Sequence, residues 1–103
     1  MIVIVDYGMG NLRSISNKLK KINIDSVISS DISAIESATK LILPGVGHFA
    51  RGMSNLHESN LIDILNYKVL KKKTPILGIC LGMQLFTTYS DEGNAKGLDW
   101  IKV

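Results

Sequence analysis

The sequence has little cysteine and no long apolar run, and each scarcity argues against a class of protein. A single cysteine, Cys80, cannot form a disulfide within the chain, which argues against a disulfide-stabilised secreted domain. The opening residues MIVIVDYG lack the basic region and cleavage site of a secretory signal, so we expect a cytoplasmic protein. Because no apolar run is long enough to cross a bilayer, we expect no membrane partner.

Charge and histidine are also sparse. The chain has 103 residues, of which 46% are hydrophobic and 20% charged, a composition typical of one small globular domain. The net charge of +3 comes largely from two lysine clusters, 18–21 and 71–73, which lie near the ends of expected helices. Cations are favoured there by the helix dipole, so we prefer solvated helix ends to an anion-binding patch and expect no nucleic-acid partner. We expect no metal and no cofactor.

Short β-branched runs alternate with segments whose apolar residues recur at helical spacing. We expect strands at residues 2–5, 27–28, 40–43 and 75–79. We expect helices at 12–22 with Asn11 as N-cap, at 32–35 with Asp31 as N-cap, at 60–69 with Ser59 or Asn60 as N-cap, and at 81–88. The alternation predicts an α/β fold, with an open, mostly parallel sheet and helices on both faces.

The last residues raise a question about completeness. Residues 97–103, GLDWIKV, begin like another strand, with apolar side chains and nothing after them to cover it. We interpret this as a truncated fold or as a segment covered by something else.

Three glycine-bearing turns follow three of the expected strands. They are Gly8-Met-Gly10, Pro44-Gly-Val-Gly47 and Gly78-Ile-Cys-Leu-Gly82. In an open parallel sheet the ligand crevice lies beyond the carboxyl ends of the strands. The three turns are therefore expected to line one edge of the sheet together.

Cys80 lies in the third turn, in the pattern glycine, any residue, nucleophile, any residue, glycine. Such a nucleophile elbow places a side chain on a strained strand-to-helix turn, where side chains two residues before and after would clash. The following helix would favour a thiolate, and the N–H of Leu81 would face a developing oxyanion. The alternative is a buried structural cysteine, since free cysteine is among the most buried residue types.

The second turn, 44–47, follows the third strand and can bring backbone N–H groups to the same edge. A backbone N–H group at this edge could act as a second donor to the oxyanion. The alternative is an ordinary turn between a strand and a helix, in which paired glycines are common.

Together these motifs resemble a known family. DYGMGNLR at 6–13, LPGVG at 43–47 and GICLGMQL at 78–85 look like the glutaminase subunits of imidazole glycerol phosphate synthases, within the class I (triad) glutamine amidotransferases. The resemblance covers residues 1–103 as the N-terminal portion of such a domain. It implies a flavodoxin-like α/β fold and a glutaminase activity that feeds ammonia to a (β/α)8-barrel synthase partner, in a heterodimer of histidine biosynthesis.

The resemblance also implies roles for individual residues. Cys80 would attack the side-chain amide of glutamine and form a γ-glutamyl thioester. The backbone of Gly45, Val46 and Gly47, together with the Leu81 N–H, would form the oxyanion hole. Gln84 and Glu92 would contact glutamine, and Asn11 would lie near the synthase interface. From the residues alone, Gln84 can also be an exposed helix residue, Glu92 a solvated loop acid, and Asn11 an N-cap.

The family's base and orienting carboxylate form a His-x-Glu arrangement that these 103 residues do not contain. The two histidines, His48 and His57, do not match that position, and we assign the base role to neither. We therefore expect little turnover from this chain alone. Two other hypotheses stay open: a non-catalytic half-domain that binds a partner, and an amidotransferase that feeds another acceptor, such as one in a surface-sugar pathway.

Overall fold

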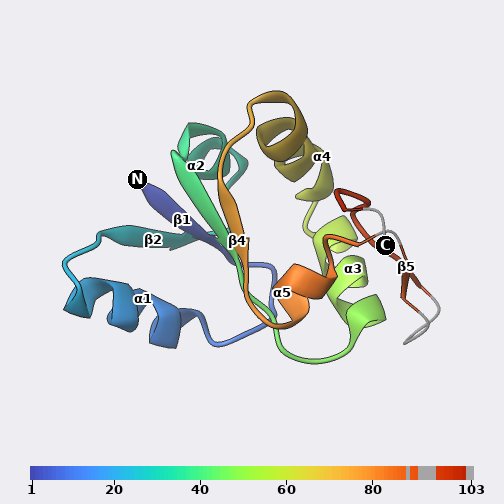
Figure 1. The fold of residues 1–103 in the computed structure, drawn as a ribbon, viewed down its shortest axis with the longest axis horizontal. Coiled ribbons are helices and arrows are strands. Elements are labelled where there is room, and N and C mark those ends of the chain that lie inside the picture. Colours follow the sequence, from blue (N-terminus) through green and yellow to red (C-terminus); the bar gives the residue numbers. More distant parts are fainter. Residues whose placement is uncertain (88, 91–94, 102–103) are drawn as a thin grey trace.

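The computed structural model describes residues 1–87, 89–90 and 95–101, and it confirms the α/β fold class (Figure 1). Four parallel strands form one sheet in the order β2-β1-β3-β4. Their bounds are β1 Ile2–Val5, β2 Ser26–Ser29, β3 Lys40–Leu43 and β4 Ile76–Gly78. The strands at 2–5 and 40–43 have the predicted bounds, while the other two differ by one residue at each end.

Helices lie on both faces of the sheet, as predicted, but in unequal number (Figure 1). Helix α1, Leu12–Lys21, lies on one face. The other face carries the remaining helical segments: α2 Ile32–Ser37, α3 Phe49–Glu58, α4 Ile62–Asn66, the π-helical turn η1 Tyr67–Lys71, and α5 Leu81–Gln84.

The hydrophobic core lies between the sheet and helices α2 to α5. Alternate residues of a strand point to opposite faces, so Val3 and Val5 of β1 join Leu41 and Leu43 of β3 on the core side. Their helical partners are fully or almost fully buried: Ile35, Phe49, Met53, Leu56, Leu65, Leu81 and Leu85. This packed side fixes the turns at the carboxyl ends of the strands.

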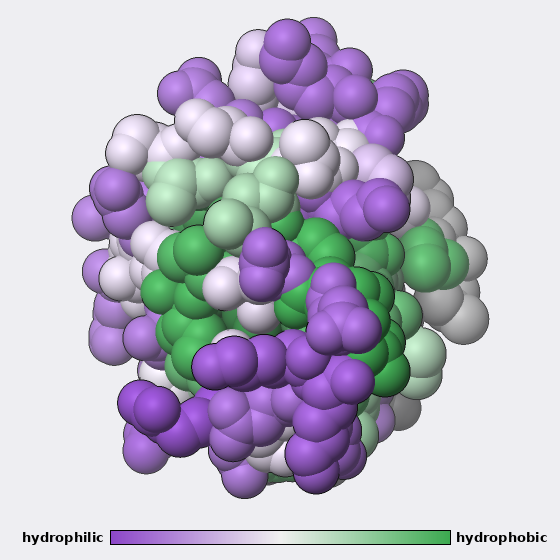
Figure 2. All heavy atoms as spheres, turned by 90° about the vertical axis from the view of Figure 1, so that its left-hand side faces the viewer, coloured by the Kyte–Doolittle hydropathy of each residue, from purple (hydrophilic) through white to green (hydrophobic). Residues whose placement is uncertain are grey.

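The face that carries α1 is less completely covered. Helix α1 has no buried residue, and Leu77 of β4 is 58% exposed. A hollow of about 280 Å³ on this side is lined largely by apolar side chains, among them Ile2, Leu19, Ile42 and Leu77. Figure 2, which views the side with α1 and the N-terminus, shows apolar side chains gathered in the middle and framed by hydrophilic ones.

Several predicted boundaries were wrong. Neither Ser59 nor Asn60 caps the next helix: Ser59 is the C-cap of α3, Asn60 adopts a positive φ of 58°, and α4 begins after Leu61. The helix expected to reach residue 69 changes to π-helical geometry at Tyr67. The helix after Cys80 ends at Gln84 instead of residue 88, so it is a single turn.

Helix α3 was not predicted at all, although Phe49, Met53 and Leu56 recur at helical spacing and are buried. The expected strand at 97–103 is not a strand over its described part. There, Ile101 only bridges Thr87, while Leu98 is buried in the core. Two short strands, β5 Tyr89–Ser90 and β6 Ala95–Lys96, pair antiparallel instead.

The lysines 18, 20 and 21 occupy the last turn of α1, which confirms their expected place at a helix end. No helix in the described part of the chain combines the length and apolar character that crossing a membrane requires.

Candidate functional site

The three glycine-bearing turns meet at the carboxyl ends of β1, β3 and β4, which confirms the predicted edge. The turn 44–47 lies between the other two. A Cβ at Gly10 would lie 3.0 Å from the nitrogen of Gly45, and a Cβ at Gly45 would lie 3.1 Å from the nitrogen of Gly82. Side chains at these positions would separate the turns, so glycine is what lets the three backbones touch.

Cys80 stands at the turn between β4 and α5 in a strained conformation. Its φ is 54° and its ψ is −118°, a combination that L-residues with side chains rarely adopt. Its thiol is free and exposed, so the alternative of a buried structural cysteine was wrong. The geometry is that of a nucleophile elbow, in which a strained backbone presents the side chain outward.

The glycines on either side of Cys80 are required by space. A Cβ at Gly78 would lie 2.6 Å from the Cα of Met83, and a Cβ at Gly82 would overlap the carbonyl oxygen of Leu43. Both obstructions are backbone atoms, which cannot move aside cheaply. The predicted reason for the glycine spacing, steric exclusion around a tight turn, is therefore confirmed.

The turn 44–47 is hydrogen-bonded to the elbow. The N–H of Leu81, the residue after Cys80, donates to the carbonyl oxygen of Gly45 at 3.0 Å. Gly47 has a φ of 120°, which favours glycine, and Val46 is 62% exposed. Within the part of the chain that the structure describes, the N–H groups of Val46 and Gly47 have no acceptor. These two free donors lie in the turn that the Leu81 bond ties to the elbow.

Tyr7 is a residue of this edge that the sequence reasoning missed. It is 2% exposed, and its hydroxyl donates to the carbonyl oxygen of Pro44. Burial raises the pKa of the Tyr7 hydroxyl well above its usual range, so the group stays protonated and remains a donor. The motif DYGMG contained the residue, but nothing in the sequence predicted a contact 37 residues away.

The other expected site residues are placed as follows. Gln84 ends α5, one turn after Cys80, and is exposed. Asn11 is the N-cap of α1, because its side-chain oxygen accepts from the Ser14 N–H at 3.2 Å. Its interpretation as a cap is confirmed, while its place at an interface stays a prediction. Glu92 lies outside the described residues.

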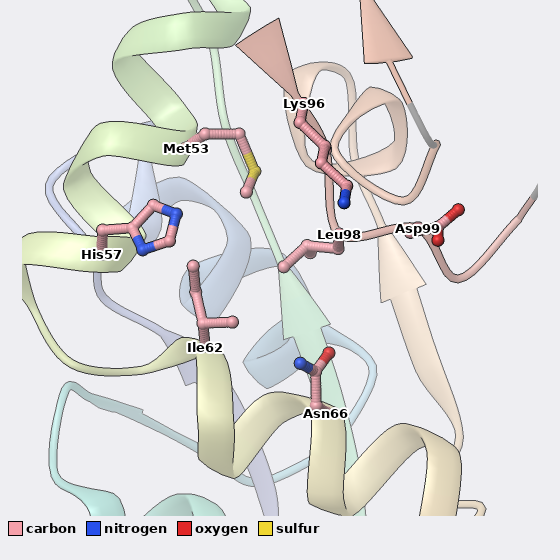
Figure 3. Close-up of a pocket in the computed structure, with 8 residues that line it drawn as sticks. Met53, His57, Ile62, Asn66, Lys96, Leu98 and Asp99 are labelled. Atoms are coloured by element: carbon pink, nitrogen blue, oxygen red, sulfur yellow. The ribbon is translucent and has the colours of Figure 1, made fainter.

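Neither histidine is placed as a partner of Cys80. His57 of α3 lines a different hollow of about 280 Å³, whose lining does not include Cys80. Figure 3 shows His57 and Asn66 of α4 on facing walls of this hollow, with Lys96 at its rim and apolar side chains between them. His48 is exposed at the start of α3 and makes no capping hydrogen bond. Among the described residues, no three His, Cys, Asp or Glu side chains are grouped to hold a metal ion.

The chain is similar to one known protein family and to named relatives in other organisms. The family model for class I glutamine amidotransferases matches residues 3–92. The chain is 60% identical over 101 residues to a protein of Methanococcus maripaludis named imidazole glycerol phosphate synthase subunit HisH 2. It is 46% identical over 101 residues to a protein of the same name from Pseudomonas aeruginosa. Each alignment covers 98% of this chain and 50% of the relative, so the chain spans about half the length of these curated relatives.

A solved structure described as a glutamine amidotransferase shares the fold. The superposition has a TM-score of 0.77 at 20% sequence identity, and it covers 96% of this chain and 52% of the other. Sequence and fold comparisons therefore agree on the extent of the match.

Proposed function

Because the chain belongs to the class I glutamine amidotransferase family, we propose that it is the nucleophile-bearing part of a glutaminase, which releases ammonia from glutamine for a synthase partner. The observation that carries this proposal is the exposed thiol of Cys80 on a strained elbow, held against a turn whose Val46 and Gly47 N–H groups have no acceptor among the described residues.

Cys80 would act as the nucleophile. Its thiolate attacks the side-chain carbonyl carbon of glutamine, and a tetrahedral oxyanion forms. The carbon–nitrogen bond then breaks, the nitrogen takes up a proton and leaves as ammonia, and a γ-glutamyl thioester remains. Water attacks the thioester, which releases glutamate and restores the thiol.

The oxyanion would be stabilised by backbone N–H groups of the turn 44–47. Val46 and Gly47 supply donors that have no acceptor within the described chain. The Leu81 N–H is in a different state, because it already donates to Gly45. For Leu81 to take part, the substrate oxygen must displace the Gly45 carbonyl.

The remaining residues have proposed roles around the substrate. We propose that Gln84, which is exposed and follows Cys80 by one helical turn, contacts glutamine. Glu92 would pair with the α-ammonium group of glutamine. Asn11, at the start of α1, would lie near the synthase partner.

Proton transfer is the step that these 103 residues do not provide for. A cysteine nucleophile of this kind needs a base and an orienting group, and the sequence contains no His-x-Glu. The curated relatives are about twice as long as this chain, so they have room for such residues outside the aligned part. We therefore propose that residues 1–103 alone can be modified at Cys80 but hydrolyse glutamine poorly.

The names of the relatives indicate the partner and pathway that we propose. Both are called subunits of imidazole glycerol phosphate synthase, so ammonia would pass to a (β/α)8-barrel subunit in histidine biosynthesis. The heterodimer would be cytoplasmic, since a reducing compartment keeps the thiol of Cys80 available. An acceptor in another pathway, such as a surface-sugar pathway, would use the same Cys80 chemistry.

Covalent labelling of Cys80 tests the proposal directly. A diazoketone analogue of L-glutamine should add once to the chain, as measured by intact-protein mass, and peptide mapping should place it on Cys80. L-glutamine should slow the labelling, D-glutamine should not, and Cys80→Ala should abolish it. Labelling that L-glutamine does not slow would contradict a glutamine site.

A second candidate function is a non-catalytic half-domain that binds another polypeptide. The apolar hollow lined by Ile2, Leu19, Ile42 and Leu77 favours it, since such surfaces mark interaction sites. Substituting Leu77 by Asp, which reverses the character of the hollow, should prevent association with a partner while leaving Cys80 labelling unchanged.

A further inference from the structure

The first turn of the chain reaches the candidate oxyanion turn through one side chain. Tyr7, just after β1, is almost fully buried, and its hydroxyl donates to the carbonyl oxygen of Pro44. A Cβ at Gly45 would lie 2.5 Å from the Tyr7 hydroxyl oxygen, so the hydroxyl also touches the next residue of the turn. A single phenol group therefore contacts the entry to the turn.

Two hydrogen bonds in sequence connect Tyr7 with the elbow. Tyr7 bonds to Pro44, and the adjacent Gly45 accepts the N–H of Leu81 at 3.0 Å. Leu81 directly follows Cys80 in the chain. The turn is thus bonded on one side to Tyr7, which follows the neighbouring strand β1, and on the other side to the elbow.

The turn has few other polar contacts to hold it. Proline has no N–H to donate, and the N–H groups of Val46 and Gly47 have no acceptor among the described residues. Gly45 and Gly47 carry no side chain that could anchor the backbone. Phenylalanine could fill the same apolar space as Tyr7, so the added function of tyrosine here is its hydroxyl.

We propose that Tyr7 is a positioning residue for the glutaminase reaction, which holds the turn 44–47 so that its free N–H groups face the oxyanion formed at Cys80. This inference rests on the proposed function. It assigns to the hydroxyl a role in the reaction, since loss of one bond would let the turn shift while the elbow itself keeps its shape. A small displacement of oxyanion donors is sufficient to lower reactivity.

The test compares two reagents for the same thiol. The γ-(4-nitrophenyl) ester of L-glutamate acylates Cys80 through a tetrahedral oxyanion and releases 4-nitrophenolate, so it needs oxyanion donors. Iodoacetamide alkylates by direct displacement of iodide at carbon and needs none. Tyr7→Phe should lower the rate of 4-nitrophenolate release from the ester by about 10-fold or more and leave the iodoacetamide rate within about twofold. The matched control is Tyr67→Phe, which removes the hydroxyl of a tyrosine that is 40% exposed and should change neither rate.

Several results would overturn the proposal. Unchanged rates with both reagents in Tyr7→Phe would do so, as would an equal fall in both rates. If Tyr7→Phe does not fold by circular dichroism, Tyr7→Met removes the hydroxyl with a flexible apolar side chain and should produce the same selective loss. Failure of both variants to fold would mean that the contact serves the fold alone.

The proposed function can fail separately. If L-glutamine does not protect Cys80 in the unsubstituted chain, the glutamine site is absent whatever Tyr7 does. If protection holds and the rate ratio is unchanged in Tyr7→Phe, only the role of Tyr7 is rejected.

Discussion

The two faces of the sheet are covered very differently within these 103 residues. On one face, helices α2 to α5 bury Leu41 and Leu43 almost completely. On the other, Ile4 and Ile42 of the central strands are buried, but Leu77 of the edge strand β4 is 58% exposed. The elbow of Cys80 and the turn 44–47 are held by contacts with the packed face, through Leu81 and Leu43. The candidate site therefore takes its shape from contacts with the packed face. Its geometry does not depend on contacts at the face that carries α1.

The largest expected effect comes from filling the contact between the elbow and β3. Gly82→Ala puts a Cβ into the carbonyl oxygen of Leu43, a backbone atom, so we expect a loss of more than about 4 kcal/mol in the free energy of unfolding. The matched control is Gly52→Ala in α3, where the Cβ would meet only side-chain ends of Leu81 and Leu85 at 3.2 to 3.3 Å. Urea unfolding of both variants decides the point, and equal losses would contradict it.

A second pair of variants measures the difference between the faces. Leu43→Ala removes a fully buried side chain and should cost about 3 kcal/mol. Leu77→Ala removes an exposed one and should cost less than about 1 kcal/mol. The measurement is again chemical denaturation. Similar costs for the two leucines would show that something shields β4 in solution.

The smallest effect concerns strain at the elbow itself. Cys80→Gly relieves the backbone penalty of a positive φ, and after the entropy cost of glycine it should raise the free energy of unfolding by about 1 kcal/mol. Cys80→Ala keeps a Cβ in the same conformation, so it should stay near the unsubstituted value. Neither variant should be labelled by the glutamine analogue. A glycine variant no more stable than the alanine variant would contradict stored strain.

Local patterns were sufficient for the strands and for the elbow. The β-branched run at 2–5 and the run at 40–43 predicted their strands to the residue, and the glycines at 78 and 82 predicted a tight turn. Both signals act over a few residues, through side-chain alternation and steric exclusion. They are therefore readable in the sequence.

The helices were harder to predict than the strands, because their ends are also set by contacts with residues far along the chain. Helix α3 was not predicted although Phe49, Met53 and Leu56 have helical spacing, because His48 at its start makes no capping hydrogen bond and Gly52 lies inside it. The single-turn length of α5 was also not predicted: Leu98 and Trp100 each donate a backbone N–H to residues just beyond it, at 2.8 and 2.9 Å to Leu85 and Phe86. Hydrogen bonds from a segment about thirteen residues downstream thus end α5 at a point where local helix propensity would continue it.

The sequence by itself determined the α/β alternation, the family, the position of Cys80 between two obligatory glycines, and the absence of a His-x-Glu in these 103 residues. Only the tertiary structure decided that the thiol is exposed, that the Leu81 N–H is already bonded to Gly45, and that Tyr7 supports Pro44. The reason is physical: a turn's shape follows from neighbouring residues, whereas hydrogen-bond partners are assigned by which strands lie side by side in the folded sheet.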